Sequence, residues 1–352
     1  MDENLLIANF RKVKLQEENY TTEAFASLLR YLVRNERWFS FGLFNLLTQR
    51  KFNSMNFEPN EIIIRTQTTT DSGRPDIEIF APDFLIYIEN KVEARLERNQ
   101  IERYKSALEN SGNTNTLLIL ISKYRMKFQE YPDIYIRWFE IAEWIEREIN
   151  QLKSNEAFTK VAQFLEFLRY RYLAPDPATT RVAPSLKKYL QREGKDSLTS
   201  RYITRSSRLG EDPDLIPLRK LLNVMAFSIE RTFPVDNFGF INSTWGRKRE
   251  RTATGFNIEY RYDFFININQ SDILLFRATM RSKLKPNPKL GHGKLLRVGH
   301  IVYWIAKLKL TDKNISFFSK SFDKQVALLS NFMKKGRTIV DRLDPNPIHW
   351  KI

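Results

Sequence analysis

The most constraining part of this chain is a short segment that reads as two neighbouring strands joined by a turn. The turn lies at Ala81-Pro82-Asp83, where proline and aspartate have the composition that turns favour. Side chains alternate between the two faces of a strand, so Glu89 and Lys91 share one side while Ile88 points into the core. Asp76 precedes Glu89 by thirteen positions, on the strand before the turn. The segment therefore brings two carboxylates and one lysine to a single place.

This arrangement suits the hydrolysis of a phosphodiester bond. Carboxylate oxygens are the ligands that a hard cation such as Mg²⁺ prefers, and that ion usually takes only one or two protein carboxylates. Asp76 and Glu89 would hold the ion, which lowers the pKa of a bound water, and the ammonium of Lys91 would assist the attacking water. The alternative for Glu89 and Lys91 alone is an ordinary solvated strand face.

Two helices flank the strands. Apolar residues at helical spacing predict one helix over residues 21–34, with Glu23 in its first turn, and another from Glu93 to Asn110. Gln100 and Tyr104 are neighbours on the second helix because they are four residues apart. Glu23 could reach a metal site or simply favour the helix dipole. Gln100 and Tyr104 could support the site or form the inner edge of an amphipathic helix.

The order of these elements is αβββαβ. Strands are expected near residues 61–67, 75–80, 85–91 and 116–121. The segment from about residue 19 to 122 resembles the PD-(D/E)xK nuclease superfamily, with Pro75-Asp76 as its "PD" and Glu89-Asn90-Lys91 as its "ExK". Gly73-Arg74-Pro75-Asp76 looks like the GxxD form of the RecB-like branch, and the segment from Gln100 to Tyr104 looks like that branch's QxxxY.

The resemblance implies an α/β fold with a restriction-endonuclease-like core and a role for each matching residue. Asp76 and Glu89 would be ligands of Mg²⁺ or Mn²⁺, with Asn90 adding a backbone carbonyl, and Lys91 would be the catalytic lysine. The roles implied for the remaining residues are an acid on the first core helix and support of the substrate or the site: Glu23, Gln100 and Tyr104. Members of the branch that carry an iron–sulfur cluster need cysteines, and this chain has none.

The resemblance further implies a deoxyribonuclease, with DNA favoured over RNA, and by analogy a role in bacterial restriction or phage defence. A homodimer would suit cleavage of both strands. The alternative is a non-catalytic nucleic-acid-binding protein on a degenerate nuclease scaffold. A third reading makes the second half of the chain a sensor or docking domain that restrains the nuclease.

Composition predicts two domains. We expect a nuclease domain over residues 1–174, a proline-rich linker over 175–185, and an α+β domain over 186–352. Residues 181–352 contain 33 Lys and Arg against 15 Asp and Glu, whereas residues 1–180 contain 24 against 26. The second half therefore carries the basic surface expected of a nucleic-acid binder, although a solvated basic surface without a partner is the alternative.

The basic residues of the second half form two clusters, one between strand-like segments and one in a loop rich in Pro and Gly. The residues expected to bind nucleic acid are Arg247, Lys248, Arg249, Arg251, Lys283, Lys285, Lys289 and Lys294. Such clusters can follow a phosphate backbone, and the affinity that they give falls steeply with salt.

Several other classes of protein are disfavoured. Three histidines and no cysteine argue against a zinc ribbon, and the chain lacks the GxxxxGK[ST] spacing of a phosphate-binding loop. The first residues are acidic rather than basic and apolar, so a signal peptide is not expected, and the apolar runs are too short to span a bilayer. We therefore expect a cytoplasmic protein that has no membrane partner.

Overall fold

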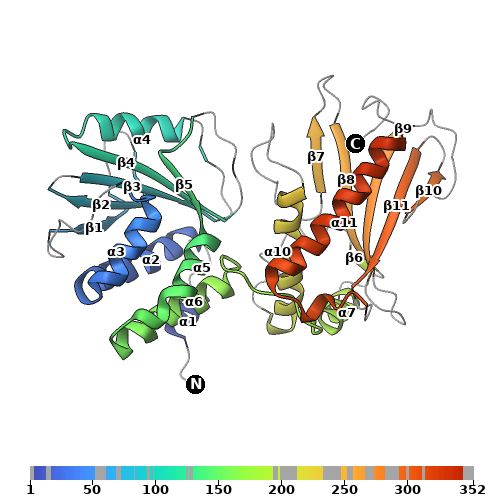
Figure 1. Ribbon diagram of the computed structural model, residues 1–352, viewed down its shortest axis with the longest axis horizontal. Helices are drawn as coiled ribbons and strands as arrows, with labels where there is room; N and C mark the ends of the chain where they lie inside the picture. The colour runs from blue at the N-terminus through green and yellow to red at the C-terminus, as the bar shows by residue number, and fades with distance from the viewer. Residues whose placement is uncertain are drawn as a thin grey trace. The chain divides into compact units, whose positions relative to one another are not determined.

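The structure is a computed structural model that places the chain in two compact units, residues 1–175 and 176–352 (Figure 1). The structure describes residues 4–12, 17–51, 61–68, 73–82, 84–92, 96–97, 99–123, 126, 130–192, 197–198, 212–232, 247–251, 257–265, 273–281, 293–298, 301–310 and 314–343.

The first unit is built on a five-stranded sheet with the order β1-β2-β3-β4-β5. Its strands are β1 (Ile63–Thr66), β2 (Ile77–Ala81), β3 (Phe84–Lys91), β4 (Asn115–Ser122) and β5 (Ile134–Arg137). Its helices are α1 (Leu5–Phe10), α2 (Glu17–Asn35), α3 (Arg37–Leu47), α4 (Gln100–Glu109), α5 (Trp138–Glu148) and α6 (Asn155–Tyr170), with a short 3-10 turn at Ile149–Gln151.

The strands combine an antiparallel and a parallel half. β1, β2 and β3 pair antiparallel, whereas β3, β4 and β5 pair parallel. Because two parallel neighbours need a crossover, α4 connects β3 to β4. The predicted αβββαβ order and the restriction-endonuclease-like α/β core are confirmed.

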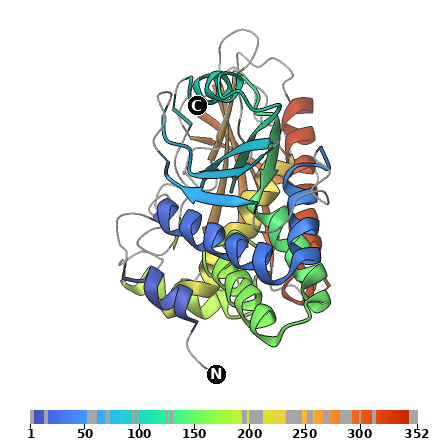
Figure 2. The same cartoon turned by 90° about the vertical axis from the view of Figure 1, so that its left-hand side faces the viewer.

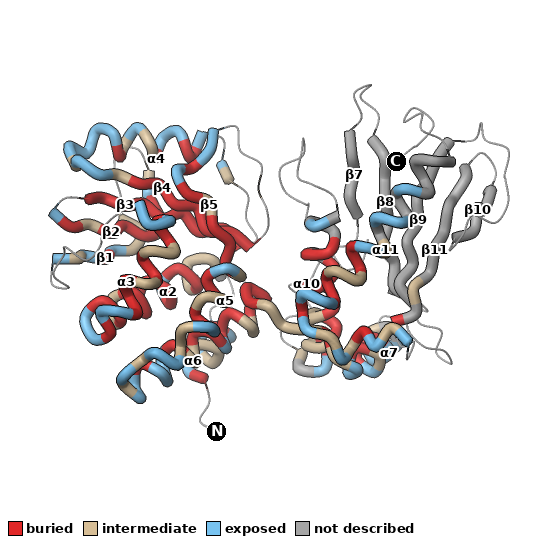
Figure 3. Tube along the Cα trace, in the orientation of Figure 1, coloured by how far each residue is buried: buried red, intermediate tan, exposed pale blue. Residues whose placement is uncertain are grey.

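Helices cover both faces of this sheet, as the edge-on strands in Figure 2 and the buried tube segments in Figure 3 show. Alternate residues of β2 and β3, such as Ile77 and Ile88, pack with α2, α3, α5 and α6 in the main core. The intervening residues, such as Tyr87, pack with α4 in a smaller cluster. This division follows from the two-residue period of a strand. It gives the sheet a thick helical layer on one face and a single helix on the other.

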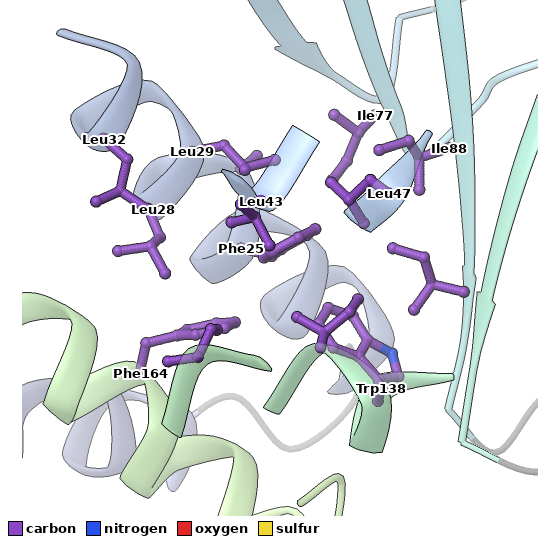
Figure 4. Close-up of a cluster of buried hydrophobic side chains, with 14 of the residues drawn as sticks. Phe25, Leu28, Leu29, Leu32, Leu43, Leu47, Ile77, Ile88, Trp138 and Phe164 are labelled. Carbon is purple, nitrogen blue, oxygen red and sulfur yellow. The ribbon is translucent and has the colours of Figure 1, made fainter. Parts of the chain in front are cut away.

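Aromatic rings fill the centre of the main core (Figure 4). Phe25 of α2 stacks on Phe164 of α6 with ring centroids 5.8 Å apart, and its edge meets Trp138 at 5.1 Å. All three side chains are almost completely buried, and burying one such side chain stabilises a fold by roughly 2–3 kcal/mol. These contacts hold α2, α5 and α6 together within the main core.

The helix after β3 is shorter than the sequence predicts. We expected it to start at Glu93, but α4 begins at Gln100. Asn99 has a φ of 60°, in the left-handed region that interrupts a right-handed helix. The residues before it therefore belong to the connection between β3 and α4, of which 93–95 and 98 lie outside the described part of the chain.

The proline-rich segment is packed rather than free. Gln325 uses its side-chain amide to bind both the N–H and the carbonyl of Ala178, each at 2.8 Å, and Lys220 pairs with Asp176 at 2.8 Å. A helix already begins at Val182, within the range 175–185 expected to be linker, since Pro184 is tolerated in a first helical turn.

The second unit pairs a six-stranded sheet with three helices in its described part. The helices are α7 (Val182–Arg192), α10 (Ile216–Thr232) and α11 (Phe322–Leu343), with 3-10 turns at Pro213–Leu215 and Phe317–Ser319. The strands are β6 (Ser197–Leu198), β7 (Arg247–Arg251), β8 (Asn257–Phe265), β9 (Ile273–Arg281), β10 (Gly293–Val298) and β11 (Ile301–Lys309). Their order is β10-β11-β9-β8-β6, and β7 also pairs with β8.

The secondary structure expected for the second half matches these elements closely. The alternation of apolar and polar residues from Phe256 to Ile268 predicts a long strand, and β8 lies within that range. The strand expected beside it over residues 272–282 is β9, and the helix expected from about Phe322 to Leu343 is α11. No helix of the described residues is long and apolar enough to cross a membrane.

Candidate active site

The two carboxylates lie on one face of the sheet. Ile77 of β2 pairs with Ile88 of β3 in the antiparallel register, so Asp76 and Glu89 occupy the next position on the opposite face. Asp76, half-buried just before β2, accepts a hydrogen bond from the backbone N–H of Asn90 at 2.8 Å through Oδ2. The strand register therefore brings the acids together at the end of β3.

Lys91 completes this group. Its Nζ lies 2.6 Å from Glu89 Oε1, and the side chains of Lys91 and Glu89 are only 11% and 3% exposed. These two residues are thus not part of a solvated strand face. Burial of an ion pair is costly unless its geometry and further hydrogen bonds compensate, so this pair calls for supporting groups.

Helix α4 supplies that support. Gln100 donates from Nε2 to Glu89 Oε1 at 2.8 Å, and the same nitrogen lies 3.3 Å from the hydroxyl of Tyr104. Tyr104 in turn donates to the backbone carbonyl of Arg74 at 2.9 Å. Both side chains are buried. The hydrogen bonds connect the QxxxY segment to Glu89 and to the loop that carries Asp76.

Gly73 allows this close approach. Its φ is 133°, a conformation that other residues rarely adopt, and a Cβ there would lie 3.0 Å from Cε1 of Tyr104. A larger residue would have to displace the tyrosine ring. The close approach of Tyr104, the tyrosine of the QxxxY pattern, therefore explains why the first position of the GxxD pattern is a glycine.

The acid that α2 brings to this place is Glu18, not Glu23. Glu18 accepts a hydrogen bond from the backbone N–H of Val92 at 2.6 Å, and its charge acts on both Asp76 and Lys91. Glu23 is exposed. Five residues turn an α-helix by about 140°, so the two acids face different directions.

Asn90 reaches the opposite face of the sheet with its side chain. It donates to Thr22 Oγ1 at 3.1 Å and accepts from Nε1 of Trp138 at 2.7 Å. Sequence reasoning assigned Asn90 a backbone carbonyl ligand and missed this role. The side chain joins β3 to α2 and α5, while its backbone N–H holds Asp76.

Electrostatics at the site favour binding of a cation. Burial, and then the neighbouring charge of Asp76, raise the pKa of Glu89 to about 7, although Lys91 and Gln100 act in the other direction. Burial and the charge of Glu18 also raise the pKa of Asp76, against the opposing effects of the Asn90 N–H, Lys91 and Arg74. The folded chain therefore holds negative charges together at a cost that a bound cation would reduce.

Two further pKa values reflect the same crowding. Burial opposes the charged form of Lys91, but the charges of Glu89, Glu18 and Asp76 outweigh it, so the pKa of this lysine lies above its usual value. Burial, and then the charge of Glu89, raise the pKa of Tyr104 to about 12. Lys91 is therefore an ammonium and Tyr104 a neutral hydroxyl near pH 7.

The donor set fits a hard divalent ion. Within the described part of the chain, Glu89 Oε2 is buried and has no hydrogen-bond partner, and such an atom is rare in a native fold. The same residues contain no group of three or more acidic or histidine side chains that could hold a metal. Two carboxylates are nevertheless what Mg²⁺ commonly takes from a protein, with water filling the rest of its shell.

The expected nucleic-acid-binding residues of the second unit are only partly described. Arg247, Lys248, Arg249 and Arg251 belong to strand β7, and Lys294 belongs to β10. Lys283, Lys285 and Lys289 lie outside the described residues.

A mixed sheet flanked by helices, with two acids and a lysine gathered at the end of its central strand, defines the class of restriction-endonuclease-like nucleases. Comparison with known families agrees, because residues 9–169 match the model of the PD-(D/E)XK nuclease superfamily. These residues are therefore similar to that superfamily, whose nucleases generally depend on a divalent metal. No curated protein and no solved structure matches the chain.

Proposed function

We propose that this protein is a metal-dependent deoxyribonuclease whose active site is the group Asp76, Glu89 and Lys91. The observation that carries the proposal is the buried, unpartnered Oε2 of Glu89 beside a second carboxylate and an ammonium. A degenerate scaffold would have no evident reason to maintain this costly arrangement.

In the proposed mechanism, Asp76 and Glu89 would hold Mg²⁺ or Mn²⁺, with Asn90 adding its backbone carbonyl. When bound, the ion would lower the pKa of a water and neutralise charge on the phosphate. Gln100 fixes Glu89, which keeps Oε2 free for the ion. Lys91, held as an ammonium, orients the attacking water and stabilises the charge that grows on the phosphate oxygens.

Tyr104 acts on the site indirectly, through the loop that carries Asp76. It fixes the Arg74 carbonyl, and so the loop that presents Asp76. Glu18 does the same for the chain after Lys91 through the N–H of Val92. We therefore regard Gln100, Tyr104 and Glu18 as positioning residues, and Glu23 has no role in this proposal.

Cleavage of plasmid DNA tests the proposal. The full-length protein should convert supercoiled plasmid to nicked or linear products with Mg²⁺ or Mn²⁺, and a chelator should stop it. Lys91→Ala should abolish cleavage, whereas the control Lys160→Ala should not, because Lys160 forms a surface pair with Glu156 on α6.

The rival function is a non-catalytic nucleic-acid-binding protein. Full retention of metal-dependent cleavage by Lys91→Ala would refute the role of Lys91. Absence of cleavage of linear duplex, circular duplex and single-stranded DNA with either metal would refute the deoxyribonuclease and favour the rival. Cleavage of RNA alone would refute the assigned substrate.

A further inference from the structure

The sheet of the second unit separates its residues into two chemically different faces. Residues that pair directly in a register lie on the same face, and residues one position away lie on the other. Following the register from β8 through β9 to β11 gives one face that is almost entirely apolar and aromatic. Its residues in these three strands are Ile258, Tyr260, Tyr262, Phe264, Leu274, Phe276, Ala278, Met280, Val302, Trp304, Ala306 and Leu308.

The other face combines cationic with apolar positions, the latter being Phe265, Ile273, Leu275, Leu296, Val298, Ile301, Tyr303 and Ile305, and its charge is strongly positive. Across the five longer strands it contains nine cationic positions against two acidic ones, Glu259 and Asp263. The cationic positions, called the basic sheet face from here on, are Arg247, Arg249, Arg251, Arg261, Arg277, Arg281, Lys294, Lys307 and Lys309. Lys248, which the sequence grouped with its neighbours, belongs to the opposite face.

Physical chemistry decides which face meets solvent. Helix α11 packs on this sheet against β9 and β11 (Figure 1), and an antiparallel sheet commonly has one face on the core and one in water. Nine cations would be very costly to bury without partners. We therefore expect the apolar face to lie toward the core and the basic sheet face to lie toward solvent.

Protection of a sheet edge does not explain the basic sheet face. Charged residues on edge strands prevent unwanted pairing with other chains, and this explanation applies to the arginines of β7, which pairs with β8 alone. Edge protection does not explain Arg261 and Arg277, because β8 and β9 have neighbours on both sides. The presence of these central cations therefore requires a different explanation.

These central cations are also unfavourable for the isolated fold. Arg247 pairs with Arg261, and Arg261 pairs with Arg277, so three arginines lie in one row across three strands. Like charges directly opposite one another destabilise a sheet, and Glu259 and Asp263, two positions from Arg261 along β8, offset only part of the repulsion. A polyanion on this face would offset the rest.

We propose that the basic sheet face is a docking surface for the phosphate backbone of duplex DNA. Five strands about 4.8 Å apart span roughly 19 Å, a length over which a duplex carries about 11 phosphate charges. Nine cationic against two acidic positions leave an excess of seven positive charges on the face, enough to neutralise more than half of those phosphate charges. The choice of DNA rests on the proposed nuclease function, whereas the attraction to a polyanion rests on the register alone.

The salt dependence of the affinity for duplex DNA tests this proposed surface independently of catalysis. The full chain carrying Lys91→Ala is mixed with a short fluorescent DNA duplex in EDTA, and anisotropy gives the affinity at a series of salt concentrations. Replacing Arg247, Arg261 and Arg277 together by Gln should weaken binding at least about tenfold at low salt. It should also reduce the slope of log affinity against log salt by about 2–3, since each phosphate contact contributes about 0.9.

A matched control removes the same charge elsewhere in the unit. Lys324, Lys334 and Lys335 are exposed on α11, and their triple replacement by Gln should leave the slope nearly unchanged. Lys307 and Lys309 offer a second pair on the basic sheet face, and their replacement should reduce the slope by about 1–2. This pair keeps the test valid if the arginine triple does not fold.

The proposal is overturned if the chain carrying Lys91→Ala alone does not bind the duplex, or if the triple substitution on α11 weakens binding as much as the substitutions on the basic sheet face. It is also overturned if neither the arginine triple nor the Lys307 and Lys309 pair weakens binding. Preference for RNA or for an acidic protein would overturn the assigned partner. If the unsubstituted protein leaves plasmid uncut while the arginine triple variant loses duplex binding, the proposed nuclease function is refuted and the proposed DNA-binding surface is supported. If the unsubstituted protein cuts plasmid while the substitutions on the face leave duplex binding unchanged, the surface is refuted and the nuclease function is supported.

Discussion

The raised pKa of Glu89 predicts how the stability of the metal-free protein changes with pH. Folding moves this pKa from 4.5 to about 7, chiefly by burial. Because the folded pKa is raised, the stabilisation is fully present below pH 4.5 and is lost as pH rises through about 7. One pKa unit corresponds to about 1.4 kcal/mol, so the loss is roughly 3 kcal/mol.

Replacing Glu89 by Gln isolates this contribution. The glutamine cannot ionise, so the stability of Glu89→Gln relative to the parent should rise by roughly 3 kcal/mol between about pH 4 and pH 8.5. Titrating groups that do not interact with Glu89 cancel in this difference. Urea unfolding in EDTA across the pH range would measure it, with Glu102→Gln, an exposed position on α4, as the control.

A flat difference between parent and variant would refute the reasoning. If their relative stability changes by less than about 1 kcal/mol across the range, the pKa of Glu89 lies near its ordinary value. The carboxylate would then not be destabilised by burial, and the case for a cation at its free oxygen would lose its energetic basis. An equal change in the Glu102→Gln control would assign the effect to charge in general.

Three further results are expected. Mg²⁺ should raise the melting temperature of the parent at pH 8 but not that of Glu89→Gln, as thermal unfolding with and without chelator would show. Tyr104→Phe should lower the free energy of unfolding by about 1 kcal/mol, because the Arg74 carbonyl loses its hydrogen bond, and should slow plasmid cleavage more than it weakens duplex binding. Glu18→Gln should reduce the cleavage rate at saturating Mg²⁺ at least about tenfold, whereas Glu23→Gln should not.

The sheet and the acids at its end could be predicted because each depends on local pattern. Alternation along β3 sets the faces of Glu89 and Lys91, and the turn after β2 sets the antiparallel register that brings Asp76 beside them. The spacing of Gln100 and Tyr104 put them on one stripe of a helix, and the structure places that stripe on the site. Short-range periodicity was sufficient for these features.

Features that depend on distant partners were not predictable in this way. Thr21 and Thr22 suggested a helix start, but α2 begins at Glu17, so the sequence reasoning did not place Glu18 in the helix. Glu18 is recognised through its contacts in the folded unit, such as the hydrogen bond from the N–H of Val92, 74 residues away. No local signal contains that contact, because strand and helix meet only in the folded unit.

Asn90, the middle residue of the Glu89-Asn90-Lys91 segment, shows how local sequence pattern and contacts with distant residues combine. Alternation alone says that Asn90 faces away from the acids, yet its partners Thr22 and Trp138 come from α2 and α5. A buried side chain that is hydrogen-bonded through both its nitrogen and its oxygen makes the local structure rigid. Since the N–H of the same residue holds Asp76, that rigidity reaches the site. Two carboxylates that repel each other would otherwise move apart, so the contacts of Asn90 on the far face help to hold Asp76 beside Glu89, as the proposed binding of a shared cation requires.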